Sequence, residues 1–261
     1  MTPPDLDALC AVARDVADAA RAPALRHFRT PIQIDSKGDL FDPVTAADRE
    51  TEAAMRAVLA AQRPEDGILG EEGEAVPSRS GLTWVLDPID GTRGYISGTP
   101  TWGVLVALRD ATGPLIGIVD QPFTGERFEG GPQGATWTRG PETRPLRTRA
   151  TERLEEATLL TTFPEIGTEA QLAAFRRVAG SCRLTRYGMD CYAYALLAAG
   201  HVDLVVEAGL HPYDIAAPIA LIEAAGGVVT DWRGEPAHDG GTALAAATPA
   251  LHAAALALLE G

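Results

Sequence analysis

The residues best suited to chemistry in this chain lie in the run WVLDPIDGT at 84–92. An apolar strand leads there into a turn that carries a carboxylate on each side, at Asp87 and Asp90. Such oxygen donors suit a hard cation such as Mg²⁺, which keeps positions open for water and a substrate phosphate. Gly91 and Thr92 then place backbone N–H groups and a hydroxyl where a helix is predicted to begin, which suits an anion. Asp-Pro and Asp-Gly are also ordinary turn pairs, so this run alone leaves a purely structural turn open.

Three further acidic segments lie elsewhere in the chain. The run GEEGE at 70–74 follows a short apolar stretch, and its adjacent carboxylates repel each other unless solvent or a cation neutralises them. Thr45 and Asp48 fit a capping box at a helix start, which is compatible with a role near a cation. Asp214 opens an apolar helix, where the helix dipole alone favours an acidic residue. Simpler interpretations therefore stay open: a solvated loop at 70–74, a helix cap at Asp48 and a favourable helix-dipole interaction at Asp214.

Taken together, these segments resemble the inositol monophosphatase family of Mg²⁺-dependent, lithium-sensitive phosphatases. The resemblance is carried by GEE at 70–72, WVLDPIDGT at 84–92, YDIAAP at 213–218 and EAAGG at 223–227, in the family's order and spacing. It covers nearly the whole chain. The family usually has Trp before the last aspartate, whereas this chain has Tyr213, which keeps an aromatic ring there.

The resemblance implies roles for individual residues. Asp48 would hold a weaker cation or its water, Thr92 would help to orient the attacking water, and Gly91 and Thr92 would bind phosphate through their amides. Glu71, Thr92 and Asp48 are thus the catalytic candidates. The implied metal ligands are Glu71, Asp87, the Ile89 carbonyl, Asp90 and Asp214.

The implied cofactor is Mg²⁺, two or three ions per site, with Mn²⁺ as a possible substitute and Li⁺ as an inhibitor. Paired cations can deprotonate a bound water, aim it in line and stabilise the departing alkoxide. Such chemistry needs no nucleophilic side chain. The three cysteines and five histidines accordingly show no spacing that suggests covalent or zinc chemistry.

Longer stretches are similar to the histidinol-phosphate phosphatase branch of this family, which removes phosphate from L-histidinol phosphate in histidine biosynthesis. They are DPIDGTRGYISG at 87–98, PTWG at 100–103, GIVDQP at 117–122, RYGMDCYAY at 186–194 and AAGHVDLVVE at 198–207. The alternative substrate is inositol 1-phosphate or another sugar-alcohol phosphate. The expected partner is therefore a small-molecule phosphate ester.

Substrate contacts are predicted at Arg93, Asp190 and Glu207. Asp190 stands where inositol phosphatases have a small residue, and Glu207 falls at the family's substrate-contacting glutamate. Two carboxylates could hold the ammonium and the imidazole of histidinol phosphate by charge-assisted hydrogen bonds, and would be left unpaired by other esters. The alternatives are a helix cap for Asp190, a surface carboxylate for Glu207 and an ion pair for Arg93. Lys37 could reach the site from a flap or be a solvated loop lysine.

Composition limits the function classes. The 261 residues are 46% hydrophobic and 22% charged, with 22 Lys and Arg against 36 Asp and Glu, a net charge of −14. This balance disfavours nucleic acid and anionic membranes as partners, and gives no support to a regulatory binding role. Three cysteines cannot form a complete disulfide framework, and no basic-then-apolar signal pattern opens the chain, so we expect a cytoplasmic protein. The family resemblance adds a homodimer as an expectation.

Periodicity predicts an α+β and α/β chain. Helices are expected at 5–22, where Pro23 kinks or ends the first, and at 46–61, followed by strands near 82–86, 102–109, 114–119, 126–129 and 134–138. Strands and helices then alternate at 157–162, 169–179, 183–187, 190–199, 202–206, 214–225, 227–231, 243–247 and 249–259. This change suggests two subdomains, 1–143 and 144–261. By family resemblance they would form a layered α-β-α-β-α sandwich with the site between them.

Overall fold

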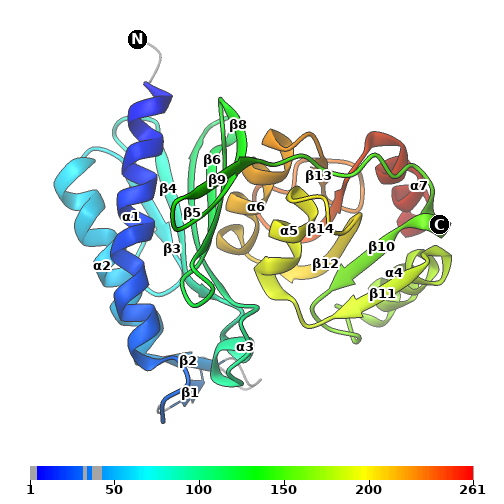
Figure 1. The fold of residues 1–261 in the computed structure, drawn as a ribbon, viewed down its shortest axis with the longest axis horizontal. Helices are drawn as coiled ribbons and strands as arrows, with labels where there is room; N and C mark the ends of the chain where they lie inside the picture. The colour runs from blue at the N-terminus through cyan, green and yellow to red at the C-terminus, as the bar shows by residue number, and fades with distance from the viewer. Residues whose placement is uncertain (1–4, 32–33, 37–42, 261) are drawn as a thin grey trace.

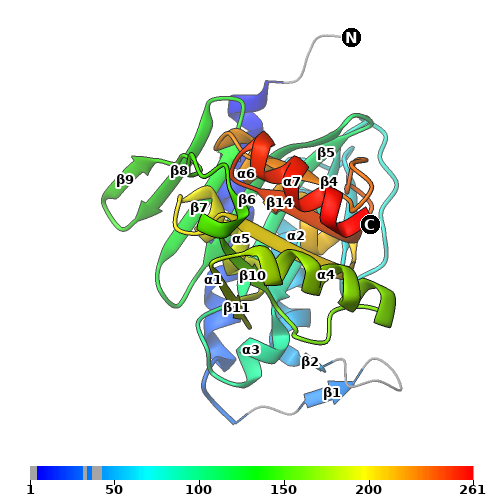
Figure 2. The ribbon, with the colours of Figure 1, turned by 90° about the vertical axis from the view of Figure 1, so that its right-hand side faces the viewer.

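The computed structural model describes residues 5–31, 34–36 and 43–260, and it has five layers (Figure 1). Two helices, α1 and α2, cover one face of a seven-stranded sheet, and α5 and α6 separate that sheet from a five-stranded one. Helices α4 and α7 cover the far face of the second sheet and lie toward the viewer in Figure 2. The predicted α-β-α-β-α sandwich is confirmed.

The first layer pairs α1 (Leu6–His27) with α2 (Ala46–Gln62). Both helices begin at side-chain caps: Asp5 accepts the N–H of Ala8, and Thr45 forms the predicted capping box with Asp48. Along α1, buried alanines alternate with larger apolar residues at helical spacing, so one stripe of the helix faces the core. The short strands β1 (Ile34–Ser36) and β2 (Pro43–Thr45) pair just before α2.

Helix α1 does not end at Pro23 but continues to His27, so of the two predicted outcomes, a kink or an end, the end is wrong. Proline removes one backbone donor, which normally destabilises a helix interior. Here Ala24 is fully buried and Phe28, just beyond the helix, is 7% exposed in the same core. These apolar contacts hold one more turn of helix after Pro23.

The first sheet has the strand order β3-β4-β5-β6-β7-β8-β9, parallel between β3 and β4 and antiparallel elsewhere. Its central strands are apolar on both faces because helices cover both. The bounds are β3 Gly67–Gly70, β4 Thr83–Asp90, β5 Gly103–Asp110, β6 Gly113–Gln121, β7 Glu126–Gly131, β8 Gly134–Arg139 and β9 Glu142–Pro145.

A break in register near the end of β4 sets the direction of its carboxylates. Across β5, Asp87 pairs with Leu105 and Asp90 pairs with Gly103, so three steps on β4 match two on β5. In a regular strand, residues three apart point to opposite faces. The extra residue of this bulge allows Asp87 and Asp90 to point the same way. Helix α3 (Thr92–Ile96) follows directly.

The second sheet has the order β11-β10-β12-β14-β13, with β10 parallel to both β11 and β12. The carboxyl ends of these three strands therefore meet at one edge, the usual place for ligands in such sheets. The bounds are β10 Thr158–Thr161, β11 Leu184–Tyr187, β12 Leu204–Leu210, β13 Val228–Thr230 and β14 Gly241–Ala246.

The middle layer consists of α5 (Asp190–Ala198) and α6 (Pro212–Ala224), and α6 packs directly on the first sheet. A Cβ added at Gly117 would lie 2.2 Å from the carbonyl oxygen of Ala217, so glycine is what allows this approach. The outer layer consists of α4 (Glu169–Ser181) and α7 (Pro249–Glu260), and a 3₁₀ turn (Leu154–Glu156) lies beside them.

The last strand of the first sheet ends at Pro145, and the first strand of the second begins at Thr158. The predicted subdomain boundary between residues 143 and 144 stays a prediction. Within the described part of the chain, no helix has the length and apolar character that a membrane span requires.

Candidate active site

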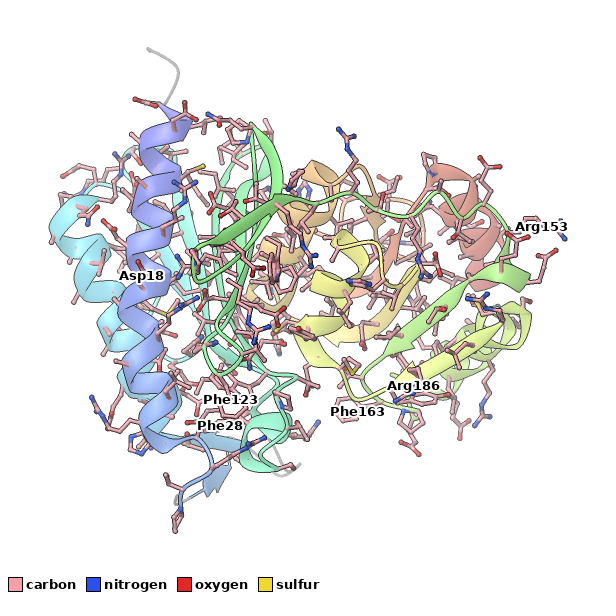
Figure 3. The ribbon with its side chains drawn as sticks, viewed as in Figure 1. Asp18, Phe28, Phe123, Arg153, Phe163 and Arg186 are labelled. Atoms are coloured by element: carbon pink, nitrogen blue, oxygen red, sulfur yellow. The ribbon has the colours of Figure 1, made fainter. Side chains whose placement is uncertain are left out.

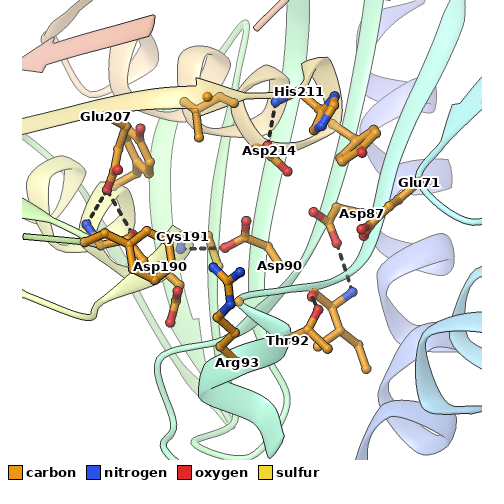
Figure 4. Close-up of a pocket in the computed structure, with 18 of the residues that line it drawn as sticks. Glu71, Asp87, Asp90, Thr92, Arg93, Asp190, Cys191, Glu207, His211 and Asp214 are labelled. Carbon is orange, nitrogen blue, oxygen red and sulfur yellow. Dashed lines mark hydrogen bonds between the residues drawn. The ribbon is translucent and has the colours of Figure 1, made fainter. Parts of the chain in front are cut away.

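A cavity of about 320 Å³ opens between the two sheets, and its walls come from both halves of the chain. The end of β4 and the start of α3 form one wall, and α5, β12 and the start of α6 form the other. In Figure 4, Glu71, Asp87 and Asp214 lie on one side of Asp90, and Asp190 and Glu207 lie on the other. The cavity is thus acidic at both ends.

Asp87, Asp90 and Asp214 form an acid cluster, in which one carboxylate oxygen of each residue lies within 4.8 Å of the others. Each carboxylate is oriented by a backbone amide (Figure 4). Asp87 accepts the N–H of Ile89 at 3.0 Å, Asp90 that of Cys191 at 2.6 Å, and Asp214 that of His211 at 2.6 Å. The predicted convergence of Asp214 with Asp87 and Asp90, from which it is distant in the chain, is therefore observed.

The acid cluster is electrostatically costly without a cation. Burial raises the pKa of Asp87 well above its ordinary value, and the charges of Glu71, Asp90 and Asp214 raise it further. Burial likewise raises the pKa of Asp90, with Asp214 and Asp190 adding to the effect. Carboxylate oxygens crowded in this way fit a hard divalent cation, which supplies the charge that water cannot supply here.

Glu71 and Asp48 occupy different positions around this cluster. Glu71 lines the cavity beside Asp87 (Figure 4). Asp48 is 1% exposed and is not among the residues that line the cavity. Its Oδ2 accepts the N–H and the hydroxyl of Thr45 at 2.8 and 2.7 Å, so its capping role is observed, while its charge still acts on Asp87.

The predicted phosphate loop follows the acid cluster. Gly91 has φ of +83°, a left-handed conformation that glycine adopts without strain, and it caps the short helix α3. The Thr92 hydroxyl donates to the carbonyl oxygen of Ile89 at 3.2 Å. Ile89, Gly91 and Thr92 all line the cavity. Lys37, the predicted flap residue, lies outside the described residues.

Asp190 is held in a strained conformation over this loop. It is the first residue of α5 rather than its N-cap, and its φ of +45° is uncommon for a residue with a side chain. Thr101 donates a hydrogen bond to its Oδ2 at 3.0 Å. A Cβ added at Gly91 would lie 2.7 Å from the Asp190 side chain, and one at Gly94 would lie 2.9 Å from it. The two glycines therefore make room for this carboxylate, whose pKa is raised by burial.

Glu207 is a buried residue, and the alternative of a surface carboxylate is wrong. It is 5% exposed, and its Oε1 accepts the N–H of Thr162 at 2.6 Å and the hydroxyl at 2.9 Å. Burial raises the pKa of Glu207 to about 7, although these hydrogen bonds oppose the effect. Glu207 lies on β12, at the side of the second sheet where the carboxyl ends of its parallel strands meet.

Arg93 lines the same cavity, and its guanidinium lies 4.9 Å from the centroid of the Phe163 ring. Figure 3 places Phe163 near Arg186, at the ends of β10 and β11. Sequence reasoning missed Thr162, Phe163 and Tyr194, which also line the cavity. Their positions were available as signals, because Thr162 ends the predicted strand 157–162, Phe163 follows it, and Tyr194 lies four residues after Asp190.

Comparison with known proteins agrees with this geometry. The sequence model of the inositol monophosphatase family matches residues 5–261. The chain belongs to the inositol monophosphatase family. A solved structure of an inositol monophosphatase from Zymomonas mobilis matches this family member with a TM-score of 0.88 and 39% identity, over 99% of this chain and 100% of the other. The protein is accordingly a metal-dependent phosphomonoesterase of this family.

Curated relatives within the inositol monophosphatase family carry names of two activities. A chloroplastic bifunctional phosphatase IMPL2 from Arabidopsis thaliana is 41% identical over 88% of this chain, which spans 66% of the plant protein. A histidinol-phosphatase from Chlorobaculum parvum is 33% identical over 95% of this chain and 93% of its own length. An inositol-1-monophosphatase ImpA from Mycolicibacterium smegmatis is 32% identical over 100% of this chain and 95% of its own. These identities leave the choice of ester to the chemistry of the cavity.

Proposed function

We propose that this protein is a Mg²⁺-dependent phosphatase that hydrolyses L-histidinol phosphate to L-histidinol and phosphate. The observation that carries the proposal is a second acidic end of the cavity, formed by Asp190 and Glu207, opposite the acid cluster. Glu207 falls at the family's substrate-contacting glutamate, so Asp190 is the member of this pair that discriminates between esters. Its added negative charge suits an ester with an ammonium and an imidazole better than one with only hydroxyl groups.

At the metal end, Glu71, Asp87, Asp90, Asp214 and the Ile89 carbonyl would hold the cations. Bound divalent ions supply a water of lowered pKa and neutralise charge on the phosphoryl oxygens. Thr92 already donates its proton to Ile89, so its oxygen is left to accept a hydrogen bond from the attacking water and orient it. Attack of that water on phosphorus would form a new P–O bond as the ester P–O bond breaks, and the proton that the water loses would pass through solvent to the departing alkoxide. Glu71 and Asp48 complete the proposed catalytic set, and the amides of Gly91 and Thr92 would bind phosphate.

At the other end, Asp190 and Glu207 would bind the nitrogen groups of the substrate through charge-assisted hydrogen bonds. Arg93 lies between the two ends in Figure 4, where its positive charge can approach the phosphate or counterbalance Asp190. The strain at Asp190 supports a functional role, because such conformations persist where the surrounding structure enforces them.

Inositol 1-phosphate is the second candidate substrate. The similarity to the inositol-1-monophosphatase of Mycolicibacterium smegmatis favours it, at nearly the identity of the bacterial histidinol-phosphatase. The predicted homodimer and cytoplasmic location are likewise proposals.

The test is phosphate release by purified protein with Mg²⁺ from histidinol phosphate and inositol 1-phosphate. We expect kcat/KM to be at least tenfold higher for histidinol phosphate. Asp190→Asn keeps the side-chain shape and tolerates a positive φ, so it should remove most of that preference while inositol phosphate hydrolysis changes little. Equal rates with both esters, or a variant that loses both activities in proportion, would contradict the substrate assignment.

A further inference from the structure

The loop after β3, which carries Glu71, is held by a buried side chain of α2. Glu52 is 2% exposed. Its Oε2 accepts the N–H of Glu72 at 2.7 Å, and its Oε1 accepts the N–H of Gly73 at 2.8 Å. The Glu72 amide is part of the planar peptide unit that joins Glu72 to Glu71. The hydrogen bond to Glu52 therefore fixes the backbone at Glu71 itself.

Arg56, one helical turn after Glu52 on α2, extends this contact. Its Nε donates to Oε1 of Glu52 at 2.6 Å, and its Nη1 donates to the carbonyl oxygen of Glu74 at 3.0 Å. Glu52 and Arg56, which we call the loop anchor, thus bind the backbone at three successive residues, 72 to 74.

Two glycines give the loop anchor its room. A Cβ added at Gly70 would lie 2.4 Å from Oε1 of Glu52, and one at Gly73 would lie 2.9 Å from the guanidinium carbon of Arg56. Neither glycine has a positive φ. The close approach of the loop anchor, rather than the backbone conformation, therefore requires glycine on both sides of the two glutamates.

The loop anchor acts on the cavity only through the loop. Glu71 lines the cavity beside Asp87 (Figure 4), whereas Glu52 and Arg56 are not among the lining residues. After burial, the charge of Glu71 is the largest cause of the raised pKa of Asp87, so the position of Glu71 matters to the acid cluster. Stability alone explains the loop anchor poorly, because apolar residues of similar volume often stabilise a core as well as a buried ion pair does.

We propose that Glu52 is a positioning residue that, together with Arg56, sets the affinity of the active site for its cation by holding Glu71 beside the acid cluster. The inference rests on the metal site of the proposed function, but not on which ester is hydrolysed. A ligand on an unrestrained loop would lose conformational freedom when the cation binds, whereas one that the fold already holds does not. Asp48 lies one turn before Glu52, so α2 contributes to the metal end of the cavity at two points.

The experiment measures Mg²⁺ binding by Glu52→Gln in a thermal-unfolding titration. The amide keeps the side-chain shape, but it loses the charge beside Arg56 and one of the two acceptors for the loop. Residues that orient metal ligands typically contribute tenfold to a hundredfold to metal affinity, so we expect the dissociation constant of Mg²⁺ to rise about tenfold. The Mg²⁺ concentration for half-maximal phosphate release should rise in parallel. Saturating Mg²⁺ should restore kcat close to the wild-type value, because no residue of the cavity has changed.

Asp66→Asn is the matched control. Asp66 is 3% exposed, accepts a hydrogen bond from Nε of Arg63 at 2.7 Å, and precedes β3, whereas Glu71 follows it. Both variants remove one negative charge and break a buried hydrogen-bond network, so both should unfold at a lower temperature than the wild type in EDTA. Only Glu52→Gln should require more Mg²⁺. An unchanged requirement in Glu52→Gln, or an equal rise in both variants, would overturn the proposal.

Arg56→Lys keeps the test decisive if Glu52→Gln does not fold. Lysine keeps a positive charge beside Glu52 but lacks the planar fork that also reaches the Glu74 carbonyl. We expect a smaller rise in the Mg²⁺ requirement, again with kcat restored at saturating Mg²⁺. An unchanged requirement in this variant would count against the proposal in the same way.

The wild-type enzyme separates this inference from the proposed function. If Mg²⁺ does not stabilise the wild type beyond NaCl of equal ionic strength, the metal site fails and the role of the loop anchor fails with it. If Mg²⁺ stabilises the wild type but the enzyme prefers inositol 1-phosphate, only the substrate proposal fails. If the wild type responds to Mg²⁺ and the loop-anchor variants respond identically, only the role of Glu52 and Arg56 is refuted.

Discussion

Asp87 illustrates, at the scale of one residue, how an active site opposes stability. Its carboxylate is 1% exposed and is surrounded by the charges of Glu71, Asp90 and Asp214. A buried carboxylate with like charges nearby favours its neutral form. The proposed metal site requires the ionised form of Asp87, which a bound cation would stabilise.

Replacing this carboxylate should separate activity from stability. We expect Asp87→Asn to lower phosphate release in Mg²⁺ on the order of a thousandfold or more, because a charge-stabilising group at the reacting centre is lost. In EDTA the same variant should unfold at a higher temperature than the wild type, because one repelling charge is gone. Asp239→Asn, whose side chain is 87% exposed, is the control and should change neither quantity. Near-normal activity in Asp87→Asn would mean that this loop holds no essential metal.

At the scale of elements, α6 packs so closely on the first sheet that an added side-chain atom would clash. Gly117 on β6 and Gly130 on β7 face the backbone of α6, the helix that carries Asp214. A Cβ at Gly117 would lie 2.2 Å from the Ala217 carbonyl oxygen, and one at Gly130 would lie 2.4 Å from the Leu221 Cα. The neighbour in each case is backbone, which cannot rotate away as a side chain would.

Gly117→Ala should therefore destabilise the protein by about 1–3 kcal/mol, the usual effect of overpacking a core. The measurement is the free energy of unfolding in urea. The matched control is Gly180→Ala on α4, where no atom lies within 4 Å of the added Cβ. That variant should gain roughly 0.5–1 kcal/mol from better helix propensity. Equal effects of the two changes would show that α6 moves freely against the sheet.

At the scale of elements, the sequence predicts features that depend on neighbouring residues but not those that depend on tertiary contacts. Strand β4 was predicted at 82–86 from its short apolar run, although it extends to Asp90, and the capping box at Thr45 was predictable because it is local. The bulge between Asp87 and Asp90 was not, because it depends on the pairing with β5. Nor was the extension of α1 past Pro23, which depends on packing of Ala24 and Phe28.

The candidate site likewise combines features that the sequence predicts with features that it does not. Family resemblance indicated which distant carboxylates would converge, and the acid cluster agrees with it. The positive φ of Asp190 and the loop anchor have no local sequence signature, since both depend on tertiary contacts. Helical spacing does place Glu52 and Arg56 on one face of α2, but it cannot show that a loop binds there.

At the scale of the whole molecule, the site lies where separate layers meet. Asp87 and Asp90 belong to the first sheet, whereas Asp214 belongs to α6 in the middle layer. The amide of Cys191 on α5 also reaches Asp90. A cation bound to all three carboxylates would therefore link layers that are far apart in the chain, and it would bind only the folded state.

Mg²⁺ should consequently raise the unfolding temperature. A ligand at a hundred times its dissociation constant stabilises the native state by about 2.7 kcal/mol. For a chain of this size that corresponds to a rise of roughly 5–10 °C. The measurement is thermal unfolding in EDTA and across a Mg²⁺ titration.

A net charge of −14 means that any cation also relieves general repulsion, so the titration needs two controls. NaCl at matched ionic strength reports screening alone and should give a much smaller rise. Asp214→Asn breaks the acid cluster from the α6 side and should abolish the Mg²⁺-specific part while leaving the NaCl effect intact. A full Mg²⁺ response in Asp214→Asn would place the stabilising cation elsewhere and would undo the link between the layers.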